Sequence, residues 1–207
     1  VTGGSSDDYY NNSGGIGIYN NSTGIVIVSY SDIAGGKDTE GAGGTGIYNK
    51  STGTVTFSNG IITGGEGYTL GGSGIINEAG TIIILNTNIT GGEGKVSGGK
   101  GIYNKSIGTV TFSNGIIKGG KCNNSGGTDG YGIQNVSTGL VKVSNGKITS
   151  LGTKSDSYPI SGGSVILDNC IIYGIHADVP AIYADEAKNV KCMNVWSNRA
   201  LGANITN

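Results

Sequence analysis

A tetrapeptide that reads Gly-Ile-Tyr-Asn, or a close variant of it, returns at regular intervals along this 207-residue chain. It starts at Gly17, Gly46 and Gly101, and related tetrapeptides start at Gly74 and Gly132. The copies lie 27 to 31 residues apart, which is too long for a β-hairpin and fits one turn of a solenoid. Stacked copies bury their core between neighbours, so we expect function on an outer face or in the loops.

The composition favours short strands over helices. The chain has 42 Gly and only 13% charged residues, while Ile, Val, Thr, Tyr and Asn are plentiful. The formal net charge is −1, which offers no electrostatic attraction to nucleic acid or to an anionic membrane surface. No apolar run approaches the roughly 20 residues of a membrane-spanning helix, and the first residues do not read as a signal peptide. We therefore expect one all-β domain in a mature chain or an excised fragment, with no nucleic-acid partner and no membrane insertion.

Apolar and polar residues alternate within each repeat, which predicts three short strands per repeat with one face buried. The inward column of the first strand is Ile18, Ile47, Ile75, Ile102, Ile133, Ile160 and Ile182. The inward pairs of the second strand are Val26/Val28, Val55/Phe57, Ile83/Leu85, Val110/Phe112, Val141/Val143 and Val165/Leu167. The inward column of the third strand is Ile33, Ile62, Ile89, Ile117, Ile148 and Ile172. This pattern predicts a single-stranded parallel β-helix of about seven coils.

We expect the coils to occupy residues 14–175. Residues 1–13 are interpreted as an N-terminal segment or incomplete coil, and residues 176–207 as a terminal coil with a cap-like segment. The loops that follow each third strand vary in length and composition, so they are predicted to project from one edge of the rod as a binding edge.

The tetrapeptides, the strands at 54–59 and 109–114 and the ending at 62–65 are similar to repeats of known surface proteins. They resemble the right-handed parallel β-helix repeats of chlamydial polymorphic outer-membrane proteins and methanogen adhesin-like proteins, roughly over residues 14 to 175. The resemblance implies a right-handed solenoid, an extracellular or cell-surface location and a structural or adhesive role. Pectate lyases and tailspikes share this solenoid, so the resemblance is specific for fold and not for activity.

The asparagine of the tetrapeptide forms its own column, which comprises Asn20, Asn49, Asn77, Asn104 and Asn135. Stacked amides can hydrogen-bond from one coil to the next, which predicts a buried ladder. Most of these residues also open Asn-x-Ser/Thr triplets, and a ladder amide cannot carry a glycan, so the two interpretations exclude each other. The pattern favours the ladder.

The outward neighbour of the ladder is often tyrosine. Tyr19, Tyr48, Tyr103 and Tyr183 are predicted to form an exposed stripe that could contact sugar rings or a partner protein. The alternative is that tyrosine stands there because it favours strands and packs across them.

The sequence offers no catalytic residues, metal ligands or cofactor motif, because no pair of carboxylates recurs on neighbouring coils. The least repetitive segment carries His176, Asp178, Asp185, Glu186, Lys188, Trp196 and Arg199. It is interpreted as a cap over the last strand edges, with the active site of a β-helix polysaccharide lyase or glycoside hydrolase as the alternative.

The three cysteines, Cys122, Cys170 and Cys192, allow at most one internal disulfide. Cys170 and Cys192 are one short coil apart and could be bridged. Matching Val165–Asn169 to Val190–Asn194 instead puts Cys192 at the inward position of Leu167, which favours buried free thiols.

Together these patterns predict a non-enzymatic extracellular structural or adhesive segment. The alternatives are a lyase or glycoside hydrolase, and a glycan-binding module that uses the tyrosine stripe. The expected partners are a host or cell-surface glycan or protein. Self-association, end to end or laterally, is also expected because solenoid ends expose unpaired strands.

Overall fold

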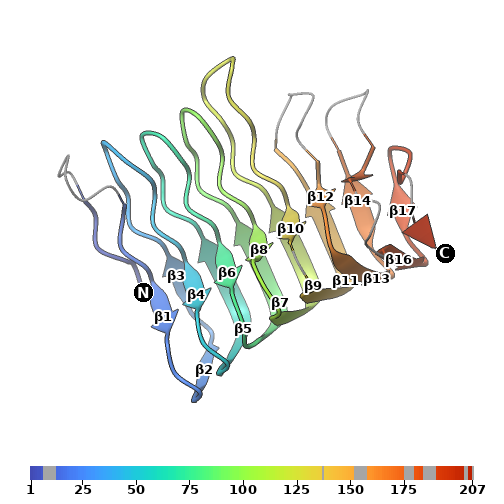
Figure 1. The fold of residues 1–207 in the computed structure, drawn as a ribbon, viewed down its shortest axis with the longest axis horizontal. Coiled ribbons are helices and arrows are strands. Elements are labelled where there is room, and N and C mark those ends of the chain that lie inside the picture. The colour runs from blue at the N-terminus through green and yellow to red at the C-terminus, as the bar shows by residue number, and fades with distance from the viewer. Residues whose placement is uncertain are drawn as a thin grey trace.

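The structure is a computed structural model that describes residues 1–6, 13–136, 138–151, 158–174, 180–183, 190–202 and 205–206. Within this part of the chain there is no helix, and all strands pair in parallel. They form a right-handed β-solenoid of about six turns, against the about seven expected (Figure 1). The fold class is therefore confirmed, whereas the proposed domain boundaries stay a prediction.

The first strand of each coil belongs to a seven-stranded sheet. Its members in order are β1 (Ile18–Asn20), β4 (Ile47–Asn49), β6 (Ile75–Asn77), β8 (Ile102–Asn104), β10 (Ile133–Asn135), β12 (Ile160–Ser161) and β15 (Ile182–Tyr183). The predicted isoleucine column is confirmed, because each of these isoleucines pairs with the next from Ile18 to Ile182.

The rest of each coil belongs to an eleven-stranded sheet. Its members are β2 (Ile25–Ser29), β3 (Asp32–Ala34), β5 (Thr54–Thr63), β7 (Thr81–Thr90), β9 (Thr109–Lys118), β11 (Leu140–Thr149), β13 (Ser164–Asp168), β14 (Ile171–Tyr173), β16 (Val190–Met193), β17 (Trp196–Ser197) and β18 (Ile205–Thr206). In the middle coils the expected second and third strands are one bent ten-residue strand. The bend falls on a left-handed asparagine, Asn59, Asn86, Asn114 or Asn145, with φ between 49° and 62°. Asparagine tolerates this conformation because its short side chain can hydrogen-bond locally.

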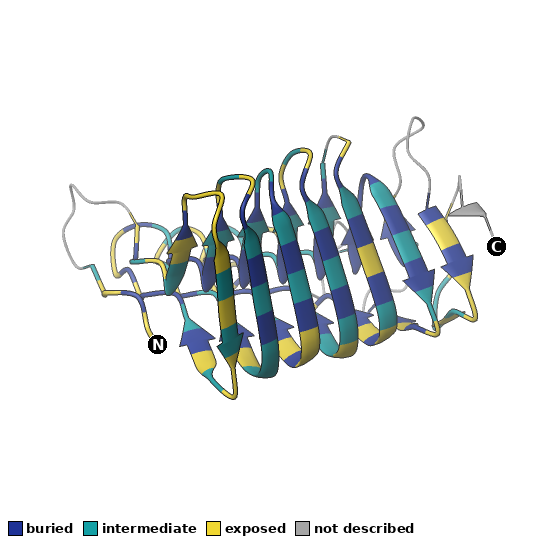
Figure 2. Cartoon of the chain, turned by 90° about the horizontal axis from the view of Figure 1, so that it is seen from below, coloured by how far each residue is buried: buried dark blue, intermediate teal, exposed yellow. Residues whose placement is uncertain are grey.

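The interior is filled by one cluster of aliphatic and aromatic side chains. Buried and more exposed residues alternate along the strands (Figure 2), as expected for a sheet that turns one face to the interior. Phe57 and Phe112 are the largest fully buried side chains, and most inward isoleucines are 0% exposed.

One inward pair was predicted wrongly. The ladder pairs Val55 with Ile82 and Phe57 with Ile84, so Ile82 and Ile84 are buried while Ile83 and Leu85 face outward. Residues 82–85 are all apolar, so alternation cannot set their register. A slip of one residue exchanges the two faces of a strand.

Glycine-rich segments close the coils on the loop side. The two legs of each loop approach so closely that glycine amides bond directly to glycine carbonyls, as in Gly65 N to Gly44 O (2.7 Å), Gly72 N to Gly65 O (2.8 Å) and Gly92 N to Gly72 O (2.7 Å). A Cβ on Gly92 would overlap the carbonyl oxygen of Gly65. We call the column that includes Gly44, Gly65, Gly72 and Gly92 the glycine neck. Its backbones lie too close together for side chains, which explains why so many glycines are needed.

All three cysteines are free and buried. Leu167 pairs with Cys192, which confirms the predicted register. Cys170 and Cys192 both belong to the core cluster, and burial raises the pKa of each thiol.

The thiols are therefore expected not to react in the folded protein, since the thiolate is the reactive form and all three are shielded. Ellman's reagent should detect no thiol under native conditions and 3 per chain in concentrated guanidinium chloride without reductant. Detection of only one thiol per chain after unfolding would show that the other two cysteines form a disulfide, which would contradict this structure.

Candidate binding surfaces

The predicted asparagine ladder is present and structural. Nδ2 of each residue donates to Oδ1 of the next: Asn20 to Asn49 (2.9 Å), Asn49 to Asn77 (3.1 Å), Asn77 to Asn104 (3.1 Å) and Asn104 to Asn135 (2.9 Å). Four of the five are 0% exposed, and Asn20 is 4% exposed. The amides also satisfy backbone carbonyls at the turn, for example Gly80 O from Asn77 Nδ2 at 3.1 Å. These side chains hold the coil together and are not available to a ligand.

The predicted tyrosine stripe lies in one outward column of the seven-stranded sheet, but it is interrupted. Tyr19 pairs with Tyr48, whereas Ile76 and Gln134 flank Tyr103 and Ser161 precedes Tyr183. Tyr19 and Tyr183 are about half exposed (48% and 47%). The structure therefore brings together one pair of the four and leaves the other two apart.

The rings of Tyr19 and Tyr48 meet edge to face with 5.5 Å between their centres. Tyr48 and Tyr103 also contact charged side chains. Tyr48 OH donates to Glu78 Oε1 at 2.6 Å, and Lys105 Nζ lies 2.9 Å from the same oxygen. Partial burial and the Glu78 hydrogen bond raise the pKa of Tyr48, and the bond from Tyr48 lowers the pKa of Glu78. The Lys100 ammonium lies 5.2 Å from the centre of the Tyr103 ring, and burial lowers the pKa of Lys100.

Sequence reasoning missed Tyr131 and Tyr158, which occupy the column before the tetrapeptide glycine. Tyr131 stacks on Tyr158 with 6.3 Å between ring centres, and Tyr158 lies against Tyr183 at 5.0 Å. The planes of the two pairs are inclined by 30° and 36°, so the three rings form one aromatic cluster. The sequence signal was the tyrosine two residues before each of the paired isoleucines Ile133 and Ile160.

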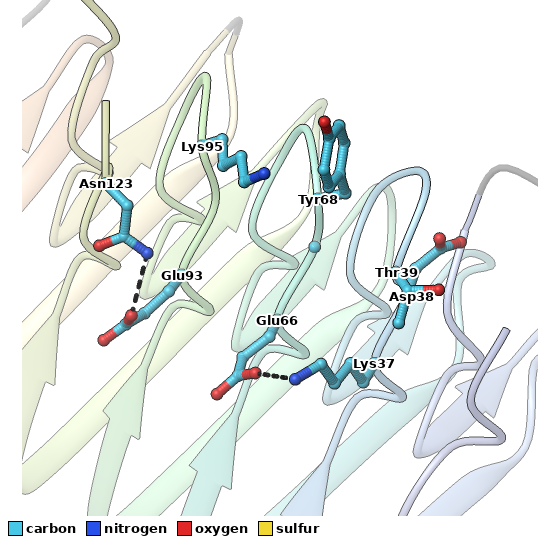
Figure 3. A pocket seen from close by; sticks show the side chains of 9 residues that line it. Lys37, Asp38, Thr39, Glu66, Tyr68, Glu93, Lys95 and Asn123 are labelled. Atoms are coloured by element: carbon cyan, nitrogen blue, oxygen red, sulfur yellow. Dashed lines mark hydrogen bonds and ion pairs between the residues drawn. The ribbon is translucent and has the colours of Figure 1, made fainter. Parts of the chain in front are cut away.

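The loop edge carries a groove of about 280 Å³ (Figure 3). Its charged side chains are paired with neighbours from adjacent loops: Lys37 Nζ with Glu66 Oε2 (2.8 Å), Asn123 Nδ2 with Glu93 Oε2 (3.3 Å) and Lys95 over the Tyr68 ring (3.8 Å). Exposed pairs of this kind contribute about 0–1 kcal/mol each. Asp38 is buried, and its Oδ1 accepts from Glu40 N and Gly41 N. The other carboxylate oxygen of Asp38, Oδ2, is buried and has no hydrogen-bond partner among the described residues. Apart from this atom, the charged groups named here are paired within the chain.

The C-terminal residues are only partly described. His176, Asp178, Asp185, Glu186 and Lys188 lie outside the described residues, so the alternative active site cannot be assembled from them. Arg199 Nε donates to Gly174 O at 3.4 Å, and Asn198 makes two bonds to the Gly174 backbone, at 3.0 and 2.9 Å. Arg199 and Asn198 therefore join the residue after β14 to the residues after β17. Trp196 is 57% exposed.

Comparison with protein-family models, with curated proteins and with solved structures gave no match for this chain. In the described ranges no three His, Cys, Asp or Glu side chains gather as metal ligands would. The same ranges contain no helix of the length and apolarity that a membrane crossing requires. The fold and the surface chemistry are therefore the basis for any statement about function.

Proposed function

We propose that this chain is a non-enzymatic, extracellular structural and adhesive segment of an adhesin-like solenoid. The observation that carries the proposal is the contrast between a filled interior and shallow grooves on the surface. Side chains and the asparagine ladder fill the interior, while the grooves found among the described residues are open and superficial. A rod with a repetitive core and a varied surface suits display and contact more than chemistry.

We call the tyrosine stripe together with the neighbouring Tyr131 and Tyr158 the tyrosine face, and it is the proposed contact surface for a protein partner. Tyrosine is enriched at protein interfaces because it combines a large apolar area with a hydroxyl group. The ring contacts favour a protein over a sugar here, since Tyr131, Tyr158 and Tyr183 contact one another and Lys100 lies over Tyr103, which leaves fewer free ring faces for stacking on a sugar. Self-association, end to end or laterally, stays a separate prediction that sedimentation at rising protein concentration tests.

The test presents the labelled protein to arrays of extracellular-matrix proteins and of glycans. We expect retention on one or more protein spots and a loss of about tenfold or more in affinity for the double variant Tyr19→Ala/Tyr183→Ala. Tyr30→Asn is the matched control, because Tyr30 is 83% exposed and lies at the bend between β2 and β3 of the other sheet, at a left-handed position that asparagine tolerates.

Incubation with uronic-acid polymers, with and without calcium, addresses the enzymatic alternative. We expect the polymers to remain intact. Release of shortened chains would contradict a non-enzymatic role, and equal retention of the double variant and the control would remove the tyrosine face from the proposal.

A further inference from the structure

A second groove lies along the bend of the C-terminal coils, away from the tyrosine face. It has a volume of about 370 Å³ and is lined by side chains or backbone of Gly115, Asn145, Gly146, Lys147, Asn169, Cys170, Ile171, Asn194 and Trp196. Two neighbouring coils contribute the same three positions, a left-handed asparagine and the two residues after it, at 145–147 and 169–171. The coils on either side contribute Gly115, and Asn194 with Trp196. The groove therefore runs parallel to the rod axis.

The floor of this groove is backbone. Gly115 and Gly146 have no side chain, and that of Cys170 turns inward, where Sγ bonds to Asp168 O at 3.2 Å. The floor's strands are already paired: Gly115 is in register with Gly146, and Trp196 N bonds to Cys170 O at 3.0 Å. No free strand edge is therefore offered to a peptide backbone at this floor.

One wall is a row of exposed amides. Asn169 Nδ2 donates to Asn145 Oδ1 at 2.7 Å. Asn145, Asn169 and Asn194 are exposed, and this is the one side-chain hydrogen bond that joins them within the described residues. Closer to the N-terminus the asparagines of the same column form a continuous hydrogen-bonded ladder. Asn114 Nδ2 donates to Asn86 Oδ1 at 3.2 Å, and Asn86 Nδ2 donates to Asn59 Oδ1 at 3.1 Å. In the groove the amides retain both donors and acceptors for a ligand.

The opposite wall is apolar and aromatic. Ile171 pairs with Trp196, and the two side chains are 46% and 57% exposed. Trp196 is the only tryptophan in the sequence. Its indole offers a flat face and one N–H donor, which suits the C–H face and a hydroxyl of a sugar ring. Lys147 is directed toward Tyr173, with 5.6 Å from its ammonium to the ring centre.

We propose that this groove binds a linear, uncharged oligosaccharide that lies along the rod axis. The amides supply donors and acceptors once per coil, at the ~4.8 Å spacing of paired strands, and the indole supplies the stacking face. The described residues of the lining include no carboxylate, and the one cation among them, Lys147, lies close to an aromatic ring. The occupied backbone of the floor disfavours an extended peptide. This inference does not depend on the tyrosine face.

The single tryptophan makes the test direct, because its fluorescence reports on this groove alone. The intact chain is titrated with cellohexaose, xylohexaose, mannohexaose and chitohexaose, and with an oligogalacturonate and an uncharged extended octapeptide as comparison ligands. We expect a saturable blue shift with at least one neutral hexasaccharide below about 1 mM, the weak end of specific affinities. No shift with any neutral hexasaccharide, or a shift with the peptide alone, would overturn the proposal.

Variants locate the binding. Asn169→Gly removes a groove amide and keeps the left-handed backbone, so affinity should fall roughly five- to tenfold. Asn86→Gly is the matched control, since Asn86 occupies the same column with φ 49° against 51° but lies outside the groove. For Trp196→Ala, calorimetry replaces fluorescence, and we expect a loss of tenfold or more. Equal affinities of Asn169→Gly and Asn86→Gly would contradict the site, whereas Tyr19→Ala/Tyr183→Ala should leave this binding unchanged.

Discussion

Replacement of Gly92 by alanine is expected to cost about 3 kcal/mol or more of unfolding free energy, or to prevent folding. Gly92 is buried in the glycine neck, where its N–H donates to Gly72 O at 2.7 Å and its carbonyl accepts from Gly99 N at 2.8 Å. A methyl group would overlap the Gly65 carbonyl oxygen, which belongs to the neighbouring backbone and cannot move alone. Guanidinium unfolding followed by circular dichroism at strand wavelengths measures the loss.

Gly126→Ala is the matched control for this substitution. Gly126 is exposed in a loop, and a Cβ built there would meet nothing within 4 Å. We expect its unfolding free energy to stay within about 0.5 kcal/mol of the parent protein. Similar midpoints for Gly92→Ala and the parent would show that the two legs of the loop are not packed as described.

Replacement of Asn77 by alanine is expected to cost about 3 kcal/mol. Asn77 is fully buried and stands in the middle of the ladder, where it bonds to Asn49, Asn104 and the Gly80 carbonyl. Alanine would leave the Asn104 Oδ1 and Gly80 O acceptors without these donors, and each buried unsatisfied polar group costs about 1–3 kcal/mol. The measurement is the same denaturant titration.

Asn86→Gly again provides the comparison, because it removes an amide from the exposed ladder and keeps the backbone conformation. Exposed amides exchange protein partners for water, so we expect a loss below about 1 kcal/mol. If the two asparagine variants lost equal stability, the inner ladder would not be the buried network that the structure describes.

The sequence was sufficient to predict the solenoid and most of its interior. A column such as Ile47, Ile75 and Ile102 repeats because each coil must present the same side chain to the same layer, and the asparagine ladder follows from the same rule. Prediction of the inward pair failed at residues 82–85, where four consecutive apolar residues carry no alternation.

The candidate surfaces were less predictable, because they depend on how neighbouring columns meet. The tyrosine stripe was placed from one column, whereas the ring stack needs Tyr131 and Tyr158 from the adjacent one. The groove at Trp196 depends on the left-handed bend. The recurring Ser-Asn-Gly at 58–60, 113–115 and 144–146 is the sequence signal of this bend. The tripeptide does not reveal which side chains from successive coils line one wall of the groove.

The central claim is that successive repeats are stacked layers of one rod. Spin labels at outward positions of the second strand test it most directly, using Ile25 paired in turn with Thr109, Leu140 and Ser164, which stand three, four and five layers away. Stacking at ~4.8 Å per layer predicts mean distances of about 14, 19 and 24 Å, in that order. Distances that fail to grow by one such step per repeat would contradict the solenoid.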